Sequence, residues 1–156
     1  MKIIQAAVLV LVGALLTAVA VPGAVGSPSR LHRVVVPEED RFTPLALTVH
    51  PGDTVQWVNH DTDDHTVVSD DAFNTAGNHG VNHLLTGTDA NGGQPGVFSL
   101  HFDHPGTFVY YCRFHSHLDA DNQPVAPGPR GGIQDSTGNF GTPMMGVITV
   151  QAGHRG

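Results

Sequence analysis

The sequence predicts an all-β protein that folds as an antiparallel sandwich of two sheets. Short runs in which apolar and polar residues alternate recur along the chain, and its many glycines and prolines fall between them. Two turns are especially clear, because Pro51-Gly52-Asp53 and His104-Pro105-Gly106 each set proline and glycine between two such runs. No segment has a convincing helical period. Short strands separated by close turns are typical of a sandwich.

The predicted strands coincide with the alternating runs. They are residues 33–36, 45–50, 54–59, 65–69, 97–103, 107–112 and 146–151.

Two longer segments break this rhythm, residues 74–95 and residues 118–143. The second is rich in proline, glycine, asparagine and aspartate, and it is longer than an ordinary connection between strands. We interpret both as inserts in a single domain, residues 27–156, because roughly 130 residues suit one hydrophobic core.

The N-terminus has the pattern of an export signal. Lys2 is followed by an uncharged, mainly apolar run and then by the small residues Ala18-Val19-Ala20. We expect residues 1–20 to be a signal peptide cleaved after Ala20, or nearer Gly26, which would place the mature protein in the periplasm or outside the cell. The alternative is an uncleaved membrane anchor, since the run approaches the length that spans a bilayer.

The charge of the chain excludes some classes of partner. Lys2 is the only lysine, so the mature chain would carry six arginines against 14 acidic residues, a net charge of about −8. Such a balance argues against binding to nucleic acid and to anionic membrane surfaces. The same charge balance does not exclude a protein as the binding partner.

The residues most suited to bind a metal lie around the only cysteine, Cys112. A lone cysteine cannot form an internal disulfide, and histidines follow it after two intervening residues (His115) and after four (His117). A thiolate beside imidazoles selects a soft or borderline metal. With His65 far upstream and Met144 near the C-terminus, these residues supply the two histidines, one thiolate and one thioether of a blue-copper site.

Several motifs, in this order and spacing, resemble the plastocyanin/azurin-type cupredoxins. They are Pro51-Gly52-Asp53-Thr54-Val55-Gln56-Trp57-Val58-Asn59, His65-Thr66-Val67, Pro105-Gly106-Thr107-Phe108-Val109-Tyr110-Tyr111-Cys112 and Met144-Met145-Gly146-Val147-Ile148-Thr149-Val150. The resemblance implies a Greek-key β-sandwich or barrel of seven or eight strands with one type 1 copper at one end. It implies His65 and Cys112 as ligands, and Asn59 as a residue that ties the first-ligand loop to the cysteine loop by hydrogen bonds.

The second histidine ligand has two candidates. The plastocyanin-like spacing selects His115 and the azurin-like spacing selects His117; we favour His115, because its turn is tighter and the Met144-Met145-Gly146 ending reads like that of plastocyanin. Met144 is the candidate axial ligand, although 26 residues separate it from His117. The alternative is that both methionines only fill space in the core.

These residues favour an exported one-electron carrier that works with a redox partner protein. Two alternatives stay open: a copper carrier or store, and a small mononuclear copper enzyme with an open coordination position. The extra histidines His79 and His83 bear on the second reading, because they could form an outer metal site with Asp70, Asp71 or Asp89.

Overall fold

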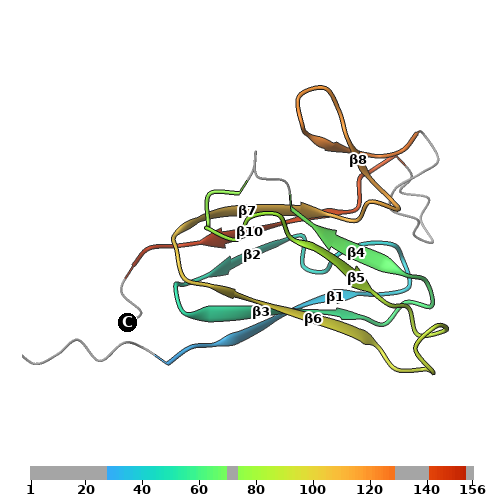
Figure 1. Cartoon of the computed structure of the whole chain (residues 1–156), viewed down its shortest axis with the longest axis horizontal. Coiled ribbons are helices and arrows are strands. Elements are labelled where there is room, and N and C mark those ends of the chain that lie inside the picture. The colour runs from blue at the N-terminus through green and yellow to red at the C-terminus, as the bar shows by residue number, and fades with distance from the viewer. Residues whose placement is uncertain (1–27, 70–73, 129–140, 154–156) are drawn as a thin grey trace, which may run out of the picture.

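The computed structural model describes residues 28–69, 74–128 and 141–153, so the predicted signal peptide lies outside the described residues. The described residues form ten strands (Figure 1), which are β1 (Leu31–Val36), β2 (Ala46–Val49), β3 (Asp53–Asn59), β4 (His65–Val68), β5 (Asn82–Leu85), β6 (Gly96–Phe102), β7 (Gly106–Tyr111), β8 (His117–Leu118), β9 (Pro124–Val125) and β10 (Met145–Val150). In these ranges no helix has both the length and the apolar character needed to cross a membrane.

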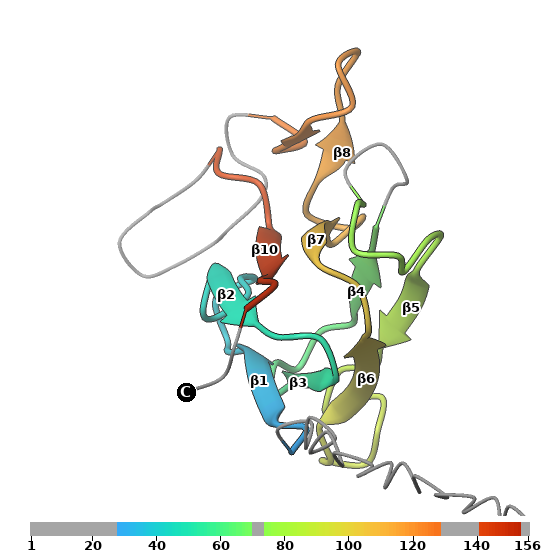
Figure 2. The same ribbon diagram turned by 90° about the vertical axis from the view of Figure 1, so that its left-hand side faces the viewer.

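Two sheets pack face to face, which confirms the predicted sandwich (Figure 1). One has the strand order β1-β3-β6 and the other has the order β2-β10-β7-β4-β5. The small hairpin β8-β9 projects from one end of the sandwich (Figure 2).

The sheets are not purely antiparallel as predicted. Strand β1 pairs with β3 in parallel, and β2 pairs with β10 in parallel. The reason is that the chain passes from one sheet to the other between β1 and β2, so these consecutive strands do not form a hairpin and each finds a distant partner.

The seven predicted strands are present, with ends that differ by at most two residues. Strand β5 and the hairpin β8-β9 were not predicted; β5 lies within the first segment that we interpreted as an insert, and the hairpin begins one residue before the second. Strand β5 is an edge strand of four residues that pairs only with β4, so too few of its positions alternate to give a clear signal.

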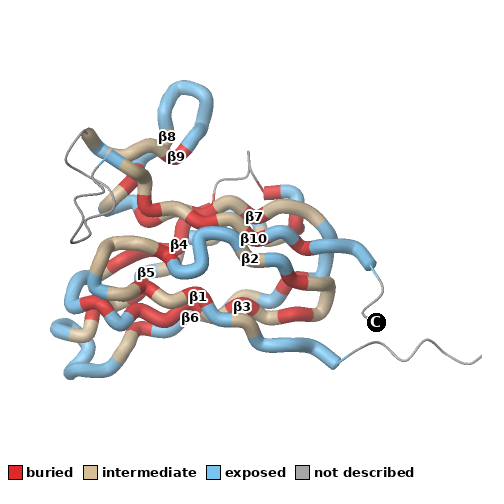
Figure 3. The backbone as a smooth tube through the Cα atoms, turned by 180° about the vertical axis from the view of Figure 1, so that it is seen from behind, coloured by how far each residue is buried: buried red, intermediate tan, exposed pale blue. Residues whose placement is uncertain are grey.

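Buried residues follow the strands of both sheets (Figure 3), and the core that they form is rich in aromatic side chains. Trp57 from β3 meets Tyr110 from β7 edge to face, with ring centroids 5.2 Å apart. The Phe42 ring also meets Tyr110 edge to face, with centroids 4.8 Å apart. Cys112 and Met144 belong to the same buried cluster. The site end of the sandwich is therefore continuous with the core, which holds it rigidly.

Gly146 provides a first test of this packing. It lies opposite Tyr110 in the β10–β7 register, and a Cβ there would overlap the Tyr110 hydroxyl and the ring carbon that carries it. Because the Tyr110 ring is buried and cannot swing aside, we expect Gly146→Ala to lower the free energy of unfolding by ~1–3 kcal/mol, the usual cost of overpacking. Urea denaturation of the metal-free protein measures this. Gly153→Ala is the matched control, since its Cβ meets nothing within 4 Å; equal stability of the two variants would contradict the prediction.

Candidate metal centre

Three sequence-predicted residues meet at one end of the sandwich. His65 begins β4 and Cys112 directly follows β7; β4 pairs with β7 through Val68 and Tyr111, so the sheet sets their separation. His115 Nδ1 lies 3.6 Å from Cys112 Sγ, and His65 Nδ1 lies 3.7 Å from the same sulfur. The three donor atoms all lie within 4.8 Å of one another.

The site is buried on the His65 side and partly open on the His115 side. His65 and Cys112 are fully buried, so His65 is not a surface histidine that merely pairs with its charged neighbours. The His115 side chain keeps 18% of its surface exposed, and the adjacent Phe114 keeps 50%. Among the three predicted ligands, His115 is therefore the one that solvent contacts in the part of the chain that the structure describes.

The surroundings of Cys112 favour its thiolate form. Burial alone raises the pKa of the thiol, but hydrogen bonds with His115 and His65 and with the backbone amides of Thr66 and Phe114 lower the pKa to about 5. The Thr66 amide donates to Sγ at 3.4 Å, and the Thr66 hydroxyl accepts a hydrogen bond from the Arg113 amide at 2.9 Å. Thr66 thus links β4 directly to the cysteine loop.

The Cys112 thiolate raises the pKa of both histidines. Burial lowers the pKa of His65, but the hydrogen bond to Cys112 and the nearby negative charges outweigh it, and the net effect is a raised pKa. The pKa of His115 is raised mainly by its hydrogen bond to Cys112. Without metal, the three side chains thus form an interacting charged group, which is the kind of arrangement in which a cation can replace protons.

Met144 returns to the cysteine loop after the long second segment. Its carbonyl accepts hydrogen bonds from the Cys112 amide at 2.9 Å and from the Ser116 hydroxyl at 3.1 Å. Its side chain is fully buried in the cluster that includes Cys112. The backbone therefore brings Met144 next to the predicted ligands despite its distance along the chain.

His117 lies elsewhere. It is exposed at the start of β8, where it pairs with Val125 of β9. It does not belong to the group of donor atoms formed by His65, Cys112 and His115.

Asn59 differs from expectation in the contacts that it makes. Its side-chain amide donates to the carbonyls of Asp63 and Leu85, at 2.9 Å and 3.0 Å, and its side-chain oxygen accepts from the Asp61 amide at 3.0 Å. These bonds shape the loop before His65 and tie it to β5. The link to the cysteine loop is made by Thr66, because the Thr66 side chain lies nearer to Cys112 along the paired strands.

Sequence reasoning missed two carboxylates beside the histidines, Asp40 and Asp61. The outer nitrogen of His65, Nε2, lies 3.1 Å from Asp61 Oδ2 and 3.7 Å from Asp40 Oδ1. Desolvation raises the pKa of Asp40, and the two histidines partly oppose this shift. Asp61 stands four residues before His65, which is a local signal, whereas nothing in the sequence places Asp40 near either histidine.

The possible outer site with His79 and His83 is not assembled in the described residues. The two groups of possible metal ligands found there both contain His65, and neither includes His79, His83 or Asp89. The ring of His83 instead stacks on Phe98, with centroids 4.2 Å apart. Asp70 and Asp71 lie outside the described residues.

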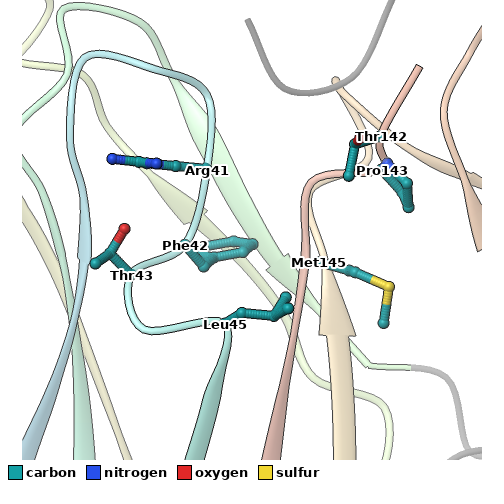
Figure 4. Close-up of a pocket in the computed structure, with 7 residues that line it drawn as sticks. All are labelled: Arg41, Phe42, Thr43, Leu45, Thr142, Pro143 and Met145. Atoms are coloured by element: carbon teal, nitrogen blue, oxygen red, sulfur yellow. The ribbon is translucent and has the colours of Figure 1, made fainter. Parts of the chain in front are cut away.

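Met145, the first residue of β10, is half-buried, whereas Met144 just before the strand is fully buried. With Phe42, Leu45 and Pro143, Met145 lines an apolar groove of about 450 Å³ between the β1–β2 connection and β10 (Figure 4). The two methionines therefore have different surroundings, one in the core and one in a groove.

The donor set fits copper. One thiolate and two imidazoles in a compact cluster suit a metal that accepts both soft sulfur and nitrogen. A zinc ion would accept the same donors, but structural zinc sites use four strong ligands. A buried thioether-bearing residue beside the cluster is the usual weak axial partner in blue-copper sites.

Comparisons with known proteins agree with this fit. The sequence profile of the copper-binding proteins of the plastocyanin/azurin family matches residues 34–120. A plastocyanin from Nostoc punctiforme is 35% identical over 77 residues, which cover 47% of this chain and 55% of the plastocyanin, so the chain spans about half the length of that relative.

Two solved structures are also similar. A purple cupredoxin from Nitrosopumilus maritimus has 20% identity and a TM-score of 0.47, with 77% of this chain and 99% of that chain covered. A pseudoazurin from Sinorhizobium meliltoi has 17% identity and a TM-score of 0.47, with 79% and 75% covered. The family profile covers more than half of the chain and includes the first histidine, the cysteine and the second histidine; the protein belongs to the plastocyanin/azurin family of copper-binding proteins.

Proposed function

We propose that this protein is a one-electron carrier that holds one type 1 copper between His65, Cys112 and His115, with Met144 as the axial ligand. The observation that carries the proposal is the cluster of two imidazole nitrogens and one thiolate sulfur, all within 4.8 Å, at the end of a rigid sandwich. Bound copper supplies a Cu(II)/Cu(I) couple that exchanges electrons quickly where the ligands move little.

The protein restricts ligand movement in three ways. Strand β4 carries His65 and pairs with β7, which leads into Cys112. The Thr66 amide donates to the sulfur, so the thiolate has a partner in addition to the metal. The Cys112 amide donates to the Met144 carbonyl, which ties both sulfur-bearing residues together. Little reorganisation is then needed when charge changes at the site.

We propose that electrons enter and leave on the His115 side. His115 is the partly exposed member of the cluster, and Phe114 beside it offers an exposed aromatic surface. Aromatic residues are enriched at protein interfaces, so a redox partner protein could dock over Phe114 and come close to the His115 ring.

Addition of one equivalent of Cu(II) to the metal-free protein tests the carrier proposal. We expect one copper per chain, an intense visible absorption from thiolate-to-copper charge transfer, and a reversible one-electron wave in voltammetry. Uptake of several coppers with no reversible wave would instead favour storage. A spectrum that shifts on addition of azide or nitrite would favour an open coordination position and an enzyme.

We also propose that the protein is exported, on the basis of the apolar run after Lys2 and the Ala18-Val19-Ala20 pattern. Intact mass measurement of the protein isolated from its own cells tests this. A mature chain that begins soon after Ala20 supports export, and retention of residues 1–20 contradicts cleavage there.

A further inference from the structure

Asp40 and Asp61 lie next to the Nε2 edges of the two imidazole rings, on the side away from Cys112. His65 Nε2 donates toward Asp61 Oδ2 across 3.1 Å, which is hydrogen-bond distance. Asp40 Oδ1 lies 3.7 Å from His65 Nε2 and 3.6 Å from His115 Nε2, so one carboxylate oxygen approaches both rings. Each imidazole therefore has Cys112 on the side of Nδ1 and a carboxylate on the side of Nε2.

Asp61 is held firmly in this position. Its other oxygen, Oδ1, accepts from the Thr62 amide at 2.6 Å, and its backbone carbonyl accepts from the Thr88 amide at 2.8 Å. The Asn59 side-chain oxygen accepts from the Asp61 amide. Because both ends of Asp61 are fixed, Oδ2 is aimed at His65 rather than free to turn toward solvent.

Asp40 reaches the site from a different part of the chain, the connection between β1 and β2. Its backbone adopts the left-handed conformation, with φ of 49°, which aspartate tolerates better than most residues. The side chain is only 14% exposed. A charge at this depth is screened less by solvent and salt than a surface charge.

We propose that Asp61 is a positioning residue that orients the His65 imidazole through a hydrogen bond from Nε2, and that the charges of Asp61 and Asp40 together lower the reduction potential of the copper. This inference rests on the proposed function of the same site. A carboxylate that accepts the Nε2 proton leaves Nδ1 free to bind metal and makes it a stronger donor. Two partly buried negative charges near the metal also favour the more highly charged Cu(II) over Cu(I).

The test compares Asp40→Asn and Asp61→Asn with the control Asp63→Asn. All three remove one negative charge, but Asp63 is exposed and lies in neither group of possible metal ligands. We expect each of the first two variants to shift the Cu(II)/Cu(I) equilibrium at least tenfold toward Cu(I), which is about +59 mV for a one-electron couple. The control shift should be clearly smaller, because exposed charges are screened.

A second measurement distinguishes orientation from charge alone. In zinc-loaded protein labelled with nitrogen-15 histidine, a hydrogen bond to a carboxylate should shift the Nε2 proton resonances downfield. Asp61→Asn removes the acceptor that lies 3.1 Å from His65 Nε2, so it should move the His65 resonance upfield by more than Asp40→Asn or Asp63→Asn does. An unchanged His65 resonance in Asp61→Asn would overturn the proposal.

The outcomes separate this inference from the carrier proposal. A wild-type protein that develops no thiolate-to-copper absorption contradicts the carrier itself. If the wild type is coloured and reversible but all three variants share its potential, only the role of the carboxylates is overturned. A potential that shifts when zinc is added to copper-loaded wild type, but not to Asp61→Asn, would also overturn it, because the carboxylates would then be ligands of a second cation.

Discussion

Cys112→Ser is expected to remove the intense visible absorption of the copper-loaded protein completely while leaving the sandwich folded. A serine hydroxyl stays protonated at neutral pH, so it offers no thiolate for charge transfer to copper. The pKa of the Cys112 thiol, about 5, shows that this environment stabilises the anion that serine cannot supply. Absorption spectra recorded during Cu(II) titration measure the effect.

The fold of that variant is expected to survive, because Cys112 is a small buried side chain and serine replaces it with a side chain of similar size. We expect the free energy of unfolding to fall by ~1–3 kcal/mol, since the hydroxyl can still accept from the Thr66 amide but the ionic contacts with the histidines are lost. Circular dichroism and urea denaturation check this. A variant that keeps an intense absorption would refute Cys112 as a ligand, and an unfolded one would show that the residue is essential to the core.

His115→Ala and His117→Ala, compared side by side, are expected to differ sharply in copper binding. His115 Nδ1 lies 3.6 Å from the Cys112 sulfur, whereas His117 is exposed on β8. Loss of a direct ligand should weaken Cu(II) binding by more than the ~10–100-fold that loss of an outer hydrogen-bond partner costs. Loss of an exposed side chain away from the site should change it by less than about threefold.

Competition with a chelator of known affinity measures both constants, and the absorption spectrum reports whether the thiolate still binds. His117→Ala serves as the matched control, because it removes the same group from a position only two residues further along the chain. Equal losses in the two variants, or a larger loss for His117→Ala, would reverse the assignment that we favour.

The positions of the strands could be predicted from local sequence patterns. Strand β3 was predicted from residue 54 and begins at Asp53, and β6 was predicted from residue 97 and begins at Gly96. Period-two alternation reports which positions face the core, and turn residues mark the ends. Strand pairing could not be predicted in this way, because another strand, β2, lies between the parallel partners β1 and β3 in the chain.

The types of donor atom and their spacing could also be predicted, because the cysteine and both histidine candidates lie within six residues of one another. The residues that surround the donor atoms could not be predicted from the sequence. Thr66, rather than Asn59, reaches the cysteine loop, and Asp40 approaches two histidines that follow it by 25 and 75 residues. Contacts at such separations depend on how sheets stack, and no local pattern encodes them.

The sequence by itself determined an all-β domain and a copper-type donor set of thiolate, imidazole and thioether, because residue types and short spacings carry that information. Only the tertiary structure decided how the donors are arranged. It places His115 beside the sulfur and His117 on an exposed hairpin, and it returns Met144 to the Cys112 amide. The physical reason is that strand pairing and sheet packing bring distant residues together, and the direction of each side chain follows from the strand or turn that carries it.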